Sequence, residues 1–329
     1  QQIQFDSRVI FESVLGYIVE NTVMQSVLQE KLKQQPQINY YAPIKLTQMQ
    51  EVAQQIVLTA ADGQCFQAKL AIAADGARSW LREQAGIAVT QHDYQQQALV
   101  ATVRTVLPHQ HIARQVFNQD EILGWLPLSE AHTASIVWSL PVVRAQALLQ
   151  QEEAAFIQTL QTIFPYLGQI ESVSARYAFP LQQQQAQHYV AGRVALIGDA
   201  AHVLHPLAGQ GINLGLLDAA SLAEVIADAV TQRRDFTHPV YLRRYQRWRR
   251  ADNELMLRGV DEIKKTFASD HQCAHIARAF GLNMIDRANW LKRMCMRHAV
   301  GQRGKLPKLA ASNGGPSISP PPLVGNPLP

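Results

Sequence analysis

The amino-acid sequence predicts an α/β fold that is divided by an inserted antiparallel sheet and completed by helices. Two apolar strands, ending near residues 73 and 197, each run into a glycine-bearing turn with an aspartate. Between them, from about residue 95 to 179, the chain changes to short strand-like runs separated by Pro, His and Asn. After residue 218 it is mostly helical in pattern to about residue 300. This sequence of patterns favours an α/β unit with an antiparallel sheet packed beside it.

The first predicted element is a short apolar run at residues 14–19, which ends at Glu20. Asn21 is placed to cap a helix, and the following Val23 and Val27 share one helical face with Leu28 and Leu32. The pattern therefore predicts an extended segment followed by a helix.

A hairpin is predicted next. Residues 55–59 and 66–73 read as strands on either side of the turn Ala61-Asp62-Gly63. The second strand runs into Asp75 and Gly76, and a helix is expected from Trp80 until Gly86 stops it. An aspartate after a strand is also common in plain turns, so a turn and a ligand site both remain open for Asp75.

The inserted region contains four strand-like runs, at residues 98–103, 115–117, 122–126 and 134–140. A helix is expected at residues 151–164. Four aromatic residues at or near strand positions either line a pocket or belong to the core, and the core is the more common place for such side chains. They are Trp125, Trp138, Tyr177 and Phe179.

The most informative stretch is residues 189–218. Residues 194–197 are apolar and bounded by glycines, which predicts a fully buried strand. Asp199 follows at the strand's carboxyl end, where open α/β sheets bind ligands. A loop with Pro206, Gly209 and Gly211 then leads into a helix from Ile212 onward.

This strand, loop and helix suit a flavin. A helix start presents free backbone N–H groups and a positive dipole end, which favour a partial negative charge. Glycines let a flat ring approach the backbone, and a carboxylate such as Asp199 accepts hydrogen bonds from polyol hydroxyls. We therefore expect the ribityl chain near Asp199 and the ring's N1–C2=O edge near the helix start. The alternative is an ordinary buried strand with a loop into a helix.

Composition sets limits on the remaining possibilities. The 329 residues suggest about two domains, and 47% hydrophobic residues supply a large core. A net charge of +4 is too mild for a nucleic-acid partner, although residues 241–250 combine arginines with Tyr245 and Trp248. The three cysteines indicate free thiols in a reducing compartment. The group His271, Cys273 and His275 lacks a second ligand pair, so no metal is expected.

Two motifs carry a family resemblance. Gly198-Asp199-Ala200-Ala201-His202, with the run from Pro206 to Asn213, resembles the second FAD motif of the class A FAD-dependent aromatic hydroxylases. Two short sequences are most similar to the ubiquinone-biosynthesis branch of this family, of the 2-polyprenylphenol hydroxylase type. They are Pro-Leu-Ala-Gly-Gln-Gly at residues 206–211 and Leu-Gly-Tyr-Ile-Val-Glu-Asn at residues 15–21. Asp75-Gly76 resembles the family's Asp-Gly motif.

The resemblance implies a Rossmann-like, p-hydroxybenzoate-hydroxylase-like FAD domain and a set of cofactor residues. The implied cofactor-binding residues are Asp199, Pro206, Gly209, Gln210, Gly211, Ile212, Asn213, Asp75 and Gly76. Glu20 and Asn21 are weaker candidates, because Thr22 stands where family members often carry Arg. His202 and His205 are nearby, but no catalytic acid or base is identified. The family's Gly-x-Gly-x-x-Gly unit does not occur in the sequence, so we expect it to precede residue 1.

The expected organisation places parts of the FAD domain at residues 1–94 and 182–232. The antiparallel substrate domain lies between them at 95–181, a helical region follows at 233–310, and 311–329 is expected to be a disordered tail.

The expected function is hydroxylation of the ring of a polyprenylated phenol in ubiquinone biosynthesis, with FAD, O2 and NAD(P)H as donor. The alternatives are another flavoprotein aromatic hydroxylase and a non-catalytic module that binds a quinone precursor. A helix at residues 290–298, with Lys292, Arg293 and Arg297, offers a face for anionic lipid or for a neighbouring helix or subunit. We also expect the protein to be cytoplasmic and to contact the inner face of the membrane peripherally. A ubiquinone-biosynthesis complex and a homo-oligomer are the expected assemblies.

Overall fold

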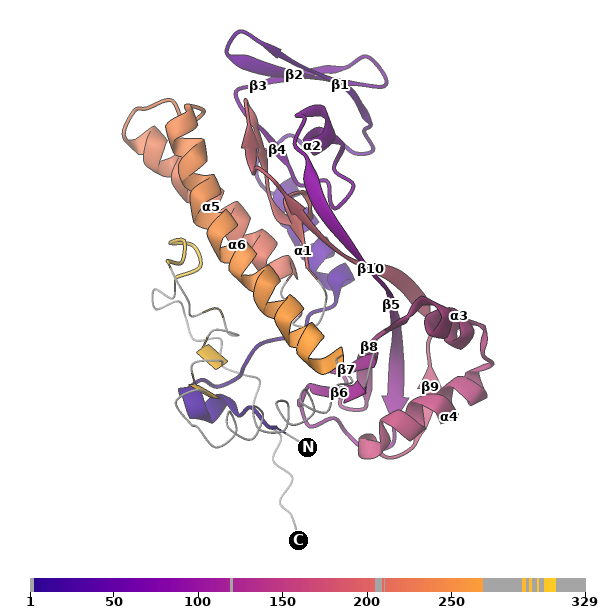
Figure 1. The fold of residues 1–329 in the computed structure, drawn as a ribbon. Helices are drawn as coiled ribbons and strands as arrows, with labels where there is room; N and C mark the ends of the chain where they lie inside the picture. Colours follow the sequence, from indigo (N-terminus) through magenta and orange to yellow (C-terminus); the bar gives the residue numbers. More distant parts are fainter. Residues whose placement is uncertain are drawn as a thin grey trace.

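The computed structural model describes residues 3–118, 121–204, 209, 211–268, 292–293, 296–297, 301 and 305–311, with no side chains described over 258–268. Figure 1 shows two regions joined by the long strands β5 (Val89–Thr105) and β10 (Tyr177–Ala186). One region holds two small sheets and the helix pair α5 (Gly211–Thr231) and α6 (Pro239–Ala268), and the other holds a large sheet with α3 (Val142–Gln150) and α4 (Glu153–Ile163). The predicted fold class is confirmed.

The first region is built around a small sheet in the order β11 (Val190–Ala191), β12 (Val194–Leu196) and β4 (Ala71–Ala73). The strand predicted at residues 194–197 is confirmed as β12, and its three residues are completely buried. It pairs in parallel with β4, with Leu196 beside Ala73. Burial on both faces explains why this strand is apolar at every position.

The predicted hairpin is confirmed, with one difference. Strands β2 (Gln55–Ala60) and β3 (Cys65–Ala68) pair antiparallel, and Gly63 takes the positive φ of +85° that the turn requires. The run at 66–73 is not one strand, because β3 and β4 belong to different sheets. Strand β1 (Leu46–Val52), which pairs with β2, was not predicted, since its polar composition hides its strand pattern.

The N-terminal helix is confirmed as α1 (Asn21–Lys33), after a 3-10 turn, η1 (Ser7–Ile10). Its cap position is Glu20 and not Asn21, and no side chain accepts a capping hydrogen bond there. None of its residues is buried. Residues 14–19 have no regular secondary structure, because no strand among the described residues pairs with them.

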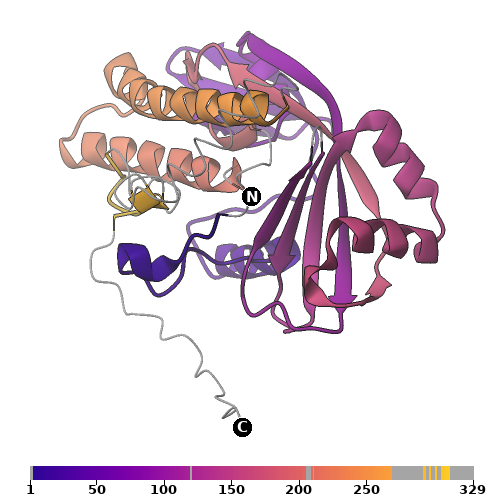
Figure 2. The same ribbon diagram turned by 60° about the horizontal axis from the view of Figure 1, so that its bottom comes forward.

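The inserted region forms most of a seven-stranded sheet. Its main path runs β13–β10–β5–β8–β7–β6, where β13 is His202–Val203, and β9 (Ile170–Val173) pairs with β5. The predicted runs fall within β5, β6 (Arg114–Asn118), β7 (Glu121–Pro127) and β8 (Thr133–Pro141). The helix expected at 151–164 is confirmed as α4 (Glu153–Ile163), and the turn η2 (Pro165–Leu167) follows it. Helix α3 (Val142–Gln150), which was not predicted, lies beside α4 over one face of the sheet (Figure 2).

Strand register decides which face each aromatic side chain occupies. Leu99 pairs with Trp138, and Trp138 pairs with Leu123, so all three point to the helix-covered face. Trp125 and Trp138 are fully buried there, and the Trp125 ring stacks on Phe164 with centroids 4.2 Å apart. These two tryptophans are therefore core residues, and the pocket alternative for them was wrong.

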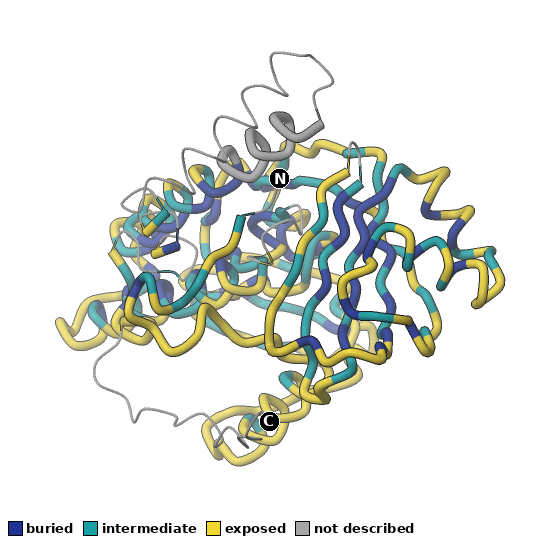
Figure 3. The backbone as a smooth tube through the Cα atoms, turned by 90° about the horizontal axis from the view of Figure 1, so that it is seen from below, coloured by how far each residue is buried: buried dark blue, intermediate teal, exposed yellow. Residues whose placement is uncertain are grey.

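Tyr177 and Phe179 lie on the opposite face of the same sheet. They pair with Val100 and Ala98 of β5, which alternate with the residues that face the helices. Their exposed fractions are 62% and 56%, in contrast to the buried positions that alternate along the strands (Figure 3). The sheet thus has one closed face and one open face, and the two aromatic rings lie on the open one.

Helices α5 (Gly211–Thr231) and α6 (Pro239–Ala268) pack against each other beside the first region (Figure 1). The helix predicted after residue 211 is confirmed as α5. Tyr245 of α6 is fully buried, and its hydroxyl donates to the Leu196 carbonyl of β12 at 2.6 Å. No helix in the described part of the chain is long and apolar enough to cross a membrane.

Several expectations fall outside the described residues. They are the group His271, Cys273 and His275, most of the helix at 290–298, and the tail after residue 311. Lys292 and Arg293 are described, and they lie over the rings of Phe5 and Phe11 at 5.7 and 5.8 Å.

Candidate cofactor site

Two aspartates follow adjacent parallel strands. Strands β4 and β12 end side by side at Ala73 and Leu196, and Asp75 and Asp199 come shortly after these ends. The parallel pairing therefore brings the two predicted turns to one edge of the sheet, although they are far apart in sequence. This is the edge at which open α/β sheets bind ligands.

Asp75 has a local structural role. Its Oδ2 accepts a hydrogen bond from the Leu81 backbone N–H at 3.1 Å, near the start of α2 (Trp80–Gln84). Ser79 caps the same helix by accepting from the Arg82 N–H at 3.0 Å. Gly76 has a φ of +81°, which favours glycine. Asp75 is nevertheless exposed, so the carboxylate keeps a solvent-facing side.

A buried arginine joins the two turns. Arg82 is only 4% exposed, and its Nη1 donates to the Ala200 carbonyl and its Nη2 to the Ala77 carbonyl, each at 3.0 Å. Gln184 of β10 also donates to the Ala77 carbonyl, at 3.0 Å. Sequence reasoning missed Arg82, because nothing in its local pattern distinguishes it from a surface residue of a short helix.

The Asp199 carboxylate lies in the turn η3 (Gly198–Ala200) and accepts no hydrogen bond from the described residues. The residue is exposed to solvent, although neighbouring protein atoms partly surround its carboxyl. Burial there raises the pKa of the Asp199 carboxyl, and the charge of nearby His202 opposes that rise. A carboxylate that is partly desolvated and unpaired is typical of a ligand site.

Helix α5 approaches η3 closely at a pair of glycines. A Cβ added to Gly215 would lie 3.1 Å from the Gly198 Cα, a contact so tight that the Gly198 backbone would have to shift. Gly198 also has a φ of +58°. The sequence signal for this contact was visible as Gly215 in the helix, but it was not used.

Asp218, on the buried face of α5, accepts four hydrogen bonds. Its Oδ2 accepts from the Gly198 N–H at 3.1 Å and from His202 Nε2 at 2.6 Å. Its Oδ1 accepts from Arg249 Nε at 2.8 Å and from Asn253 Nδ2 at 3.1 Å. Asp218 and Asn253 are 0% exposed, His202 1% and Arg249 2%. Sequence reasoning missed Asp218, Arg249 and Asn253. The side chains that bond to Asp218 lie 16 to 35 residues away from it in the sequence, so no local pattern connects them.

The network keeps Asp218 ionised. Burial would raise the pKa of this carboxyl, but the His202 hydrogen bond and the Arg249 charge together hold it below its ordinary value. Tyr189 joins through the Asn253 amide at 3.3 Å, and burial raises the pKa of its phenol. His202 Nδ1 is buried and has no partner among the described residues.

The loop before α5 is described only in part. Pro206 and Gln210 lie outside the described residues, as does His205. Gly209 has a φ of +58°. Gly211 begins α5, and no described atom lies within 4 Å of a Cβ added there. Ile212 is 50% exposed, and Asn213 is also exposed. The described part of this predicted set therefore lies at an open helix start.

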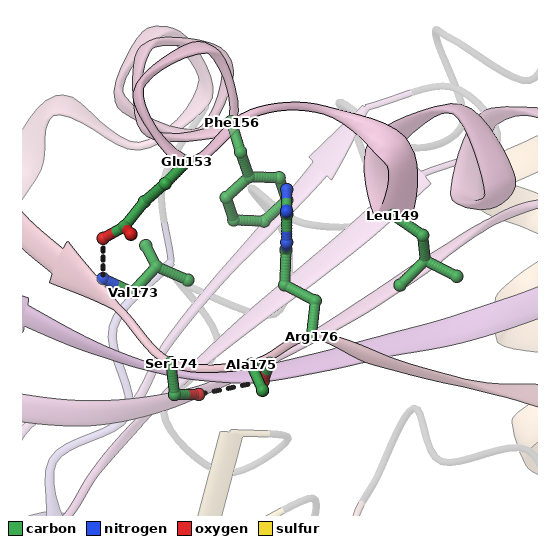
Figure 4. A pocket seen from close by; sticks show the side chains of 7 residues that line it. All are labelled: Leu149, Glu153, Phe156, Val173, Ser174, Ala175 and Arg176. Carbon is green, nitrogen blue, oxygen red and sulfur yellow. Dashed lines mark hydrogen bonds between the residues drawn. The ribbon is translucent and has the colours of Figure 1, made fainter.

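A recess of about 260 Å³ lies elsewhere, between α3, α4 and the sheet (Figure 4). Arg176 reaches into it, but its guanidinium donates to the Leu148 and Gln151 carbonyls at 2.9 and 2.6 Å and covers the Phe156 ring. Because the guanidinium already has these protein partners, we interpret the recess as a gap in the packing between helix and sheet and not as a ligand site. The described residues contain no group of three side chains that would hold a metal ion.

The structure joins a sheet edge with two aspartate turns and a helix start to an antiparallel sheet, and this is the mixed α/β fold of FAD-dependent monooxygenases. The family model described as FAD binding domain matches residues 17–258. The chain belongs to this family and, within it, to the FAD-dependent hydroxylases of the ubiquinone-biosynthesis type. The predicted family and enzyme class are thereby confirmed.

Two relatives support this placement, and one solved structure shares the fold. The chain is 36% identical to the ubiquinone hydroxylase UbiL of Rhodospirillum rubrum, over 87% of this chain and 67% of that protein. It is 34% identical to the 3-demethoxyubiquinol 3-hydroxylase of Escherichia coli, over 91% and 76%. The fold resembles p-nitrophenol 4-monooxygenase PnpA of Pseudomonas putida DLL-E4 with a TM-score of 0.71 at 18% identity, over 86% of this chain and 73% of that one.

Proposed function

We propose that this protein hydroxylates the aromatic ring of a polyprenylated phenol in ubiquinone biosynthesis, using O2 and electrons from NAD(P)H. The observation that carries the proposal is the Asp199 carboxylate, which lies at the sheet edge in the Gly-Asp motif and accepts no hydrogen bond from the part of the chain that the structure describes. The two relatives, a ubiquinone hydroxylase and a 3-demethoxyubiquinol 3-hydroxylase, support the choice of substrate class.

The described residues fit a bound FAD. Asp199 offers an acceptor that has no partner among the described residues, and a Cβ added at Gly211 would meet no described atom within 4 Å. Asp199 would hold the ribityl hydroxyls, and Gly209 with the α5 start from Gly211 to Asn213 would hold the N1–C2=O edge through backbone N–H groups. Pro206 and Gln210 complete this set, with Pro206 bordering the ring.

Asp75 and Gly76 are proposed to approach the pyrophosphate. The exposed side of Asp75 and the positive φ of Gly76 keep this turn open toward the sheet edge. When bound, the flavin supplies the oxygen-activating redox chemistry, and the protein orients and shields it.

The open face of the large sheet is the proposed substrate wall. Tyr177 and Phe179 expose their rings on this face, and the opposite face is closed by α3 and α4. Phe179→Ala should change the free energy of unfolding by less than about 0.5 kcal/mol, because the ring is mostly exposed. It should raise the KM for the phenol. An unchanged KM would remove Phe179 from the wall.

The cofactor assignment is tested with Asp199→Asn. Loss of a charged hydrogen-bond partner should weaken FAD binding by about 1.5–3 kcal/mol, measured by flavin fluorescence titration. Asp62→Asn is the matched control, because Asp62 caps only its own hairpin turn by accepting from the Gln64 N–H. Equal FAD affinity in Asp199→Asn and wild type would refute the ribityl assignment.

Product identification separates the proposed function from its rivals. A prenylated phenol incubated with FAD, O2 and either NADH or NADPH should gain one hydroxyl group on the ring. A different hydroxylated aromatic product would favour another flavoprotein hydroxylase. Absence of flavin absorbance in the purified protein, with retained binding of the phenol, would favour a non-catalytic binding module.

A membrane surface and a ubiquinone-biosynthesis complex are proposed as partners, since a polyprenyl chain partitions into lipid. Lys292 and Arg293 would supply charge toward anionic lipid, at about 1 kcal/mol per residue near the surface. Cosedimentation with phosphatidylserine vesicles should fall when both are changed to Gln. Equal binding to neutral vesicles would refute the charge-based contact.

A further inference from the structure

The turn that carries Asp199 is held from both sides by one buried carboxylate. Asp218 Oδ2 accepts the Gly198 N–H, directly before Asp199, and His202 Nε2, three residues after it. The segment between these points has two further restraints, because Ala201 N–H donates to the Gly198 carbonyl at 2.8 Å and Arg82 donates to the Ala200 carbonyl.

The other oxygen of Asp218 connects this turn to α6. Asp218 Oδ1 accepts Arg249 Nε and Asn253 Nδ2, and Arg249 Nη2 also donates to Asn253 Oδ1 at 2.8 Å. The negative charge of Asp218 is therefore balanced inside the protein before any ligand arrives. Asp199, in contrast, receives no hydrogen bond from the described residues.

We propose that Asp218 is a positioning residue, which fixes the Gly198–His202 turn in its ligand-ready shape in the absence of FAD and thereby strengthens FAD binding by Asp199. The second half of this inference rests on the proposed role of Asp199. A turn that is already ordered loses less conformational entropy when a ligand binds, so the same contact gives a higher affinity. Asp218 itself touches no ligand.

The first test needs no bound flavin. Backbone amide hydrogen exchange is measured on the flavin-free chain for peptides spanning residues 197–203 and, as an internal reference, strand β8. In Asp218→Asn the exchange rate of the turn should rise at least about tenfold more than that of β8, which reports any loss of global stability; tenfold corresponds to ~1.4 kcal/mol. His202→Asn removes only one side of the restraint and should give a smaller increase. It serves as the second variant if Asp218→Asn does not fold.

Tyr245→Phe is the matched control. It removes a buried hydrogen bond between α6 and the Leu196 carbonyl but none of the contacts to the turn. Its exchange at 197–203 should remain within about twofold of wild type, which is well below the tenfold change expected above. Unchanged exchange of the turn in both Asp218→Asn and His202→Asn, or an equal increase in β8, would overturn the proposal.

The second test links the turn to the cofactor. FAD affinity should fall at least about tenfold in Asp218→Asn and remain unchanged in Tyr245→Phe. Faster exchange without loss of FAD affinity would overturn the positioning role. If Asp199→Asn also leaves FAD affinity unchanged, the proposed function fails at Asp199 itself, while the exchange data still decide whether Asp218 holds the turn.

Discussion

The two regions of the molecule keep their shapes by different means. The interior behind the large sheet is apolar, with Trp125, Trp138 and Phe164 packed under α3 and α4. Behind the Asp199 turn lies a buried polar network of Asp218, His202, Arg249 and Asn253. The apolar interior supports the open face of the large sheet, the proposed substrate wall, without fixing the position of any single group. The directional hydrogen bonds, in contrast, fix the Gly198–His202 turn.

The contrast shows how different kinds of contact suit different tasks. Apolar packing is nondirectional and roughly proportional to buried area, so many side chains of similar size can replace one another. A buried charge network fails as a unit when one partner is removed, because it leaves an uncompensated charge. The cofactor side is therefore expected to be less tolerant of substitution than the wall.

The largest loss of stability is expected for Asp218→Ala. It removes the buried one of two carboxylates that pair with the 2%-exposed Arg249 and leaves Asp252, whose side chain is 38% exposed; breaking a buried pair costs about 3–5 kcal/mol. Urea denaturation measures the change. A loss below about 1 kcal/mol would place the pair among weak surface ion pairs and would break the contrast between the two regions.

On the wall side, Leu160→Ala should cost roughly 2–5 kcal/mol, because this completely buried side chain leaves a cavity under the sheet. The conservative change Leu160→Met should cost less than about 1.5 kcal/mol. On the cofactor side, in contrast, the conservative change Asp218→Asn should cost nearly as much stability as Asp218→Ala. Equal tolerance of conservative changes in both regions would contradict the comparison.

A smaller effect separates two glycines of α5. Gly215→Ala should destabilise the protein by about 1–3 kcal/mol, because its Cβ would press on the Gly198 backbone at 3.1 Å. Gly211→Ala meets no described atom and should leave stability within about 0.5 kcal/mol while weakening FAD binding. Thermal denaturation with and without FAD checks both. Equal destabilisation by the two variants would show that Gly211 is needed for folding and not for a ligand.

The smallest effects concern pH, and two carboxyls should act in opposite directions. The folded-state pKa of Asp218 is lowered, so its contribution to stability is present above the ordinary value of 3.8 and is lost as pH falls through the lowered value. The pKa of Asp199 is raised by burial, so its charged form disfavours folding at neutral pH. Asp199→Asn should therefore leave the flavin-free protein as stable or more stable at pH 7. A clear destabilisation there would mean that Asp199 has a structural partner.

Local sequence patterns were enough to predict much of the fold. The apolar run of β12, the glycine-bearing turn at residues 61–63 and the helical spacing of α5 each reflect local physics. Strand β1 was missed because its burial pattern is almost entirely exposed, and α3 because it follows β8 directly at Pro141. The face occupied by Trp138 depends on register with β5 and β7, which no local pattern gives.

The candidate site was predictable to a smaller extent. Asp75 and Asp199 were found because each follows a strand, and the resemblance to known motifs linked them. Arg82 and Arg249 were missed because their importance comes from partners 118 and 31 residues away. Long-range polar networks have no short sequence signature, so their members look like surface charges until the fold places them.

The paired strands β5 and β10 have a consequence for how the gene can change. They pair from Tyr177–Val100 to Ala186–Val89, with an irregularity between Leu181 and Gln182. On one side of that bulge β10 pairs with β13, next to the Asp199 turn, and on the other side the two strands carry the proposed substrate wall. Side chains alternate between the two faces of the sheet. A one-residue deletion in β10, on the Tyr177 side of the bulge, would therefore turn Tyr177 and Phe179 toward α3 and α4. Lineages of this protein should therefore accumulate insertions in surface loops and substitutions in this ribbon, but very few single-codon length changes within it.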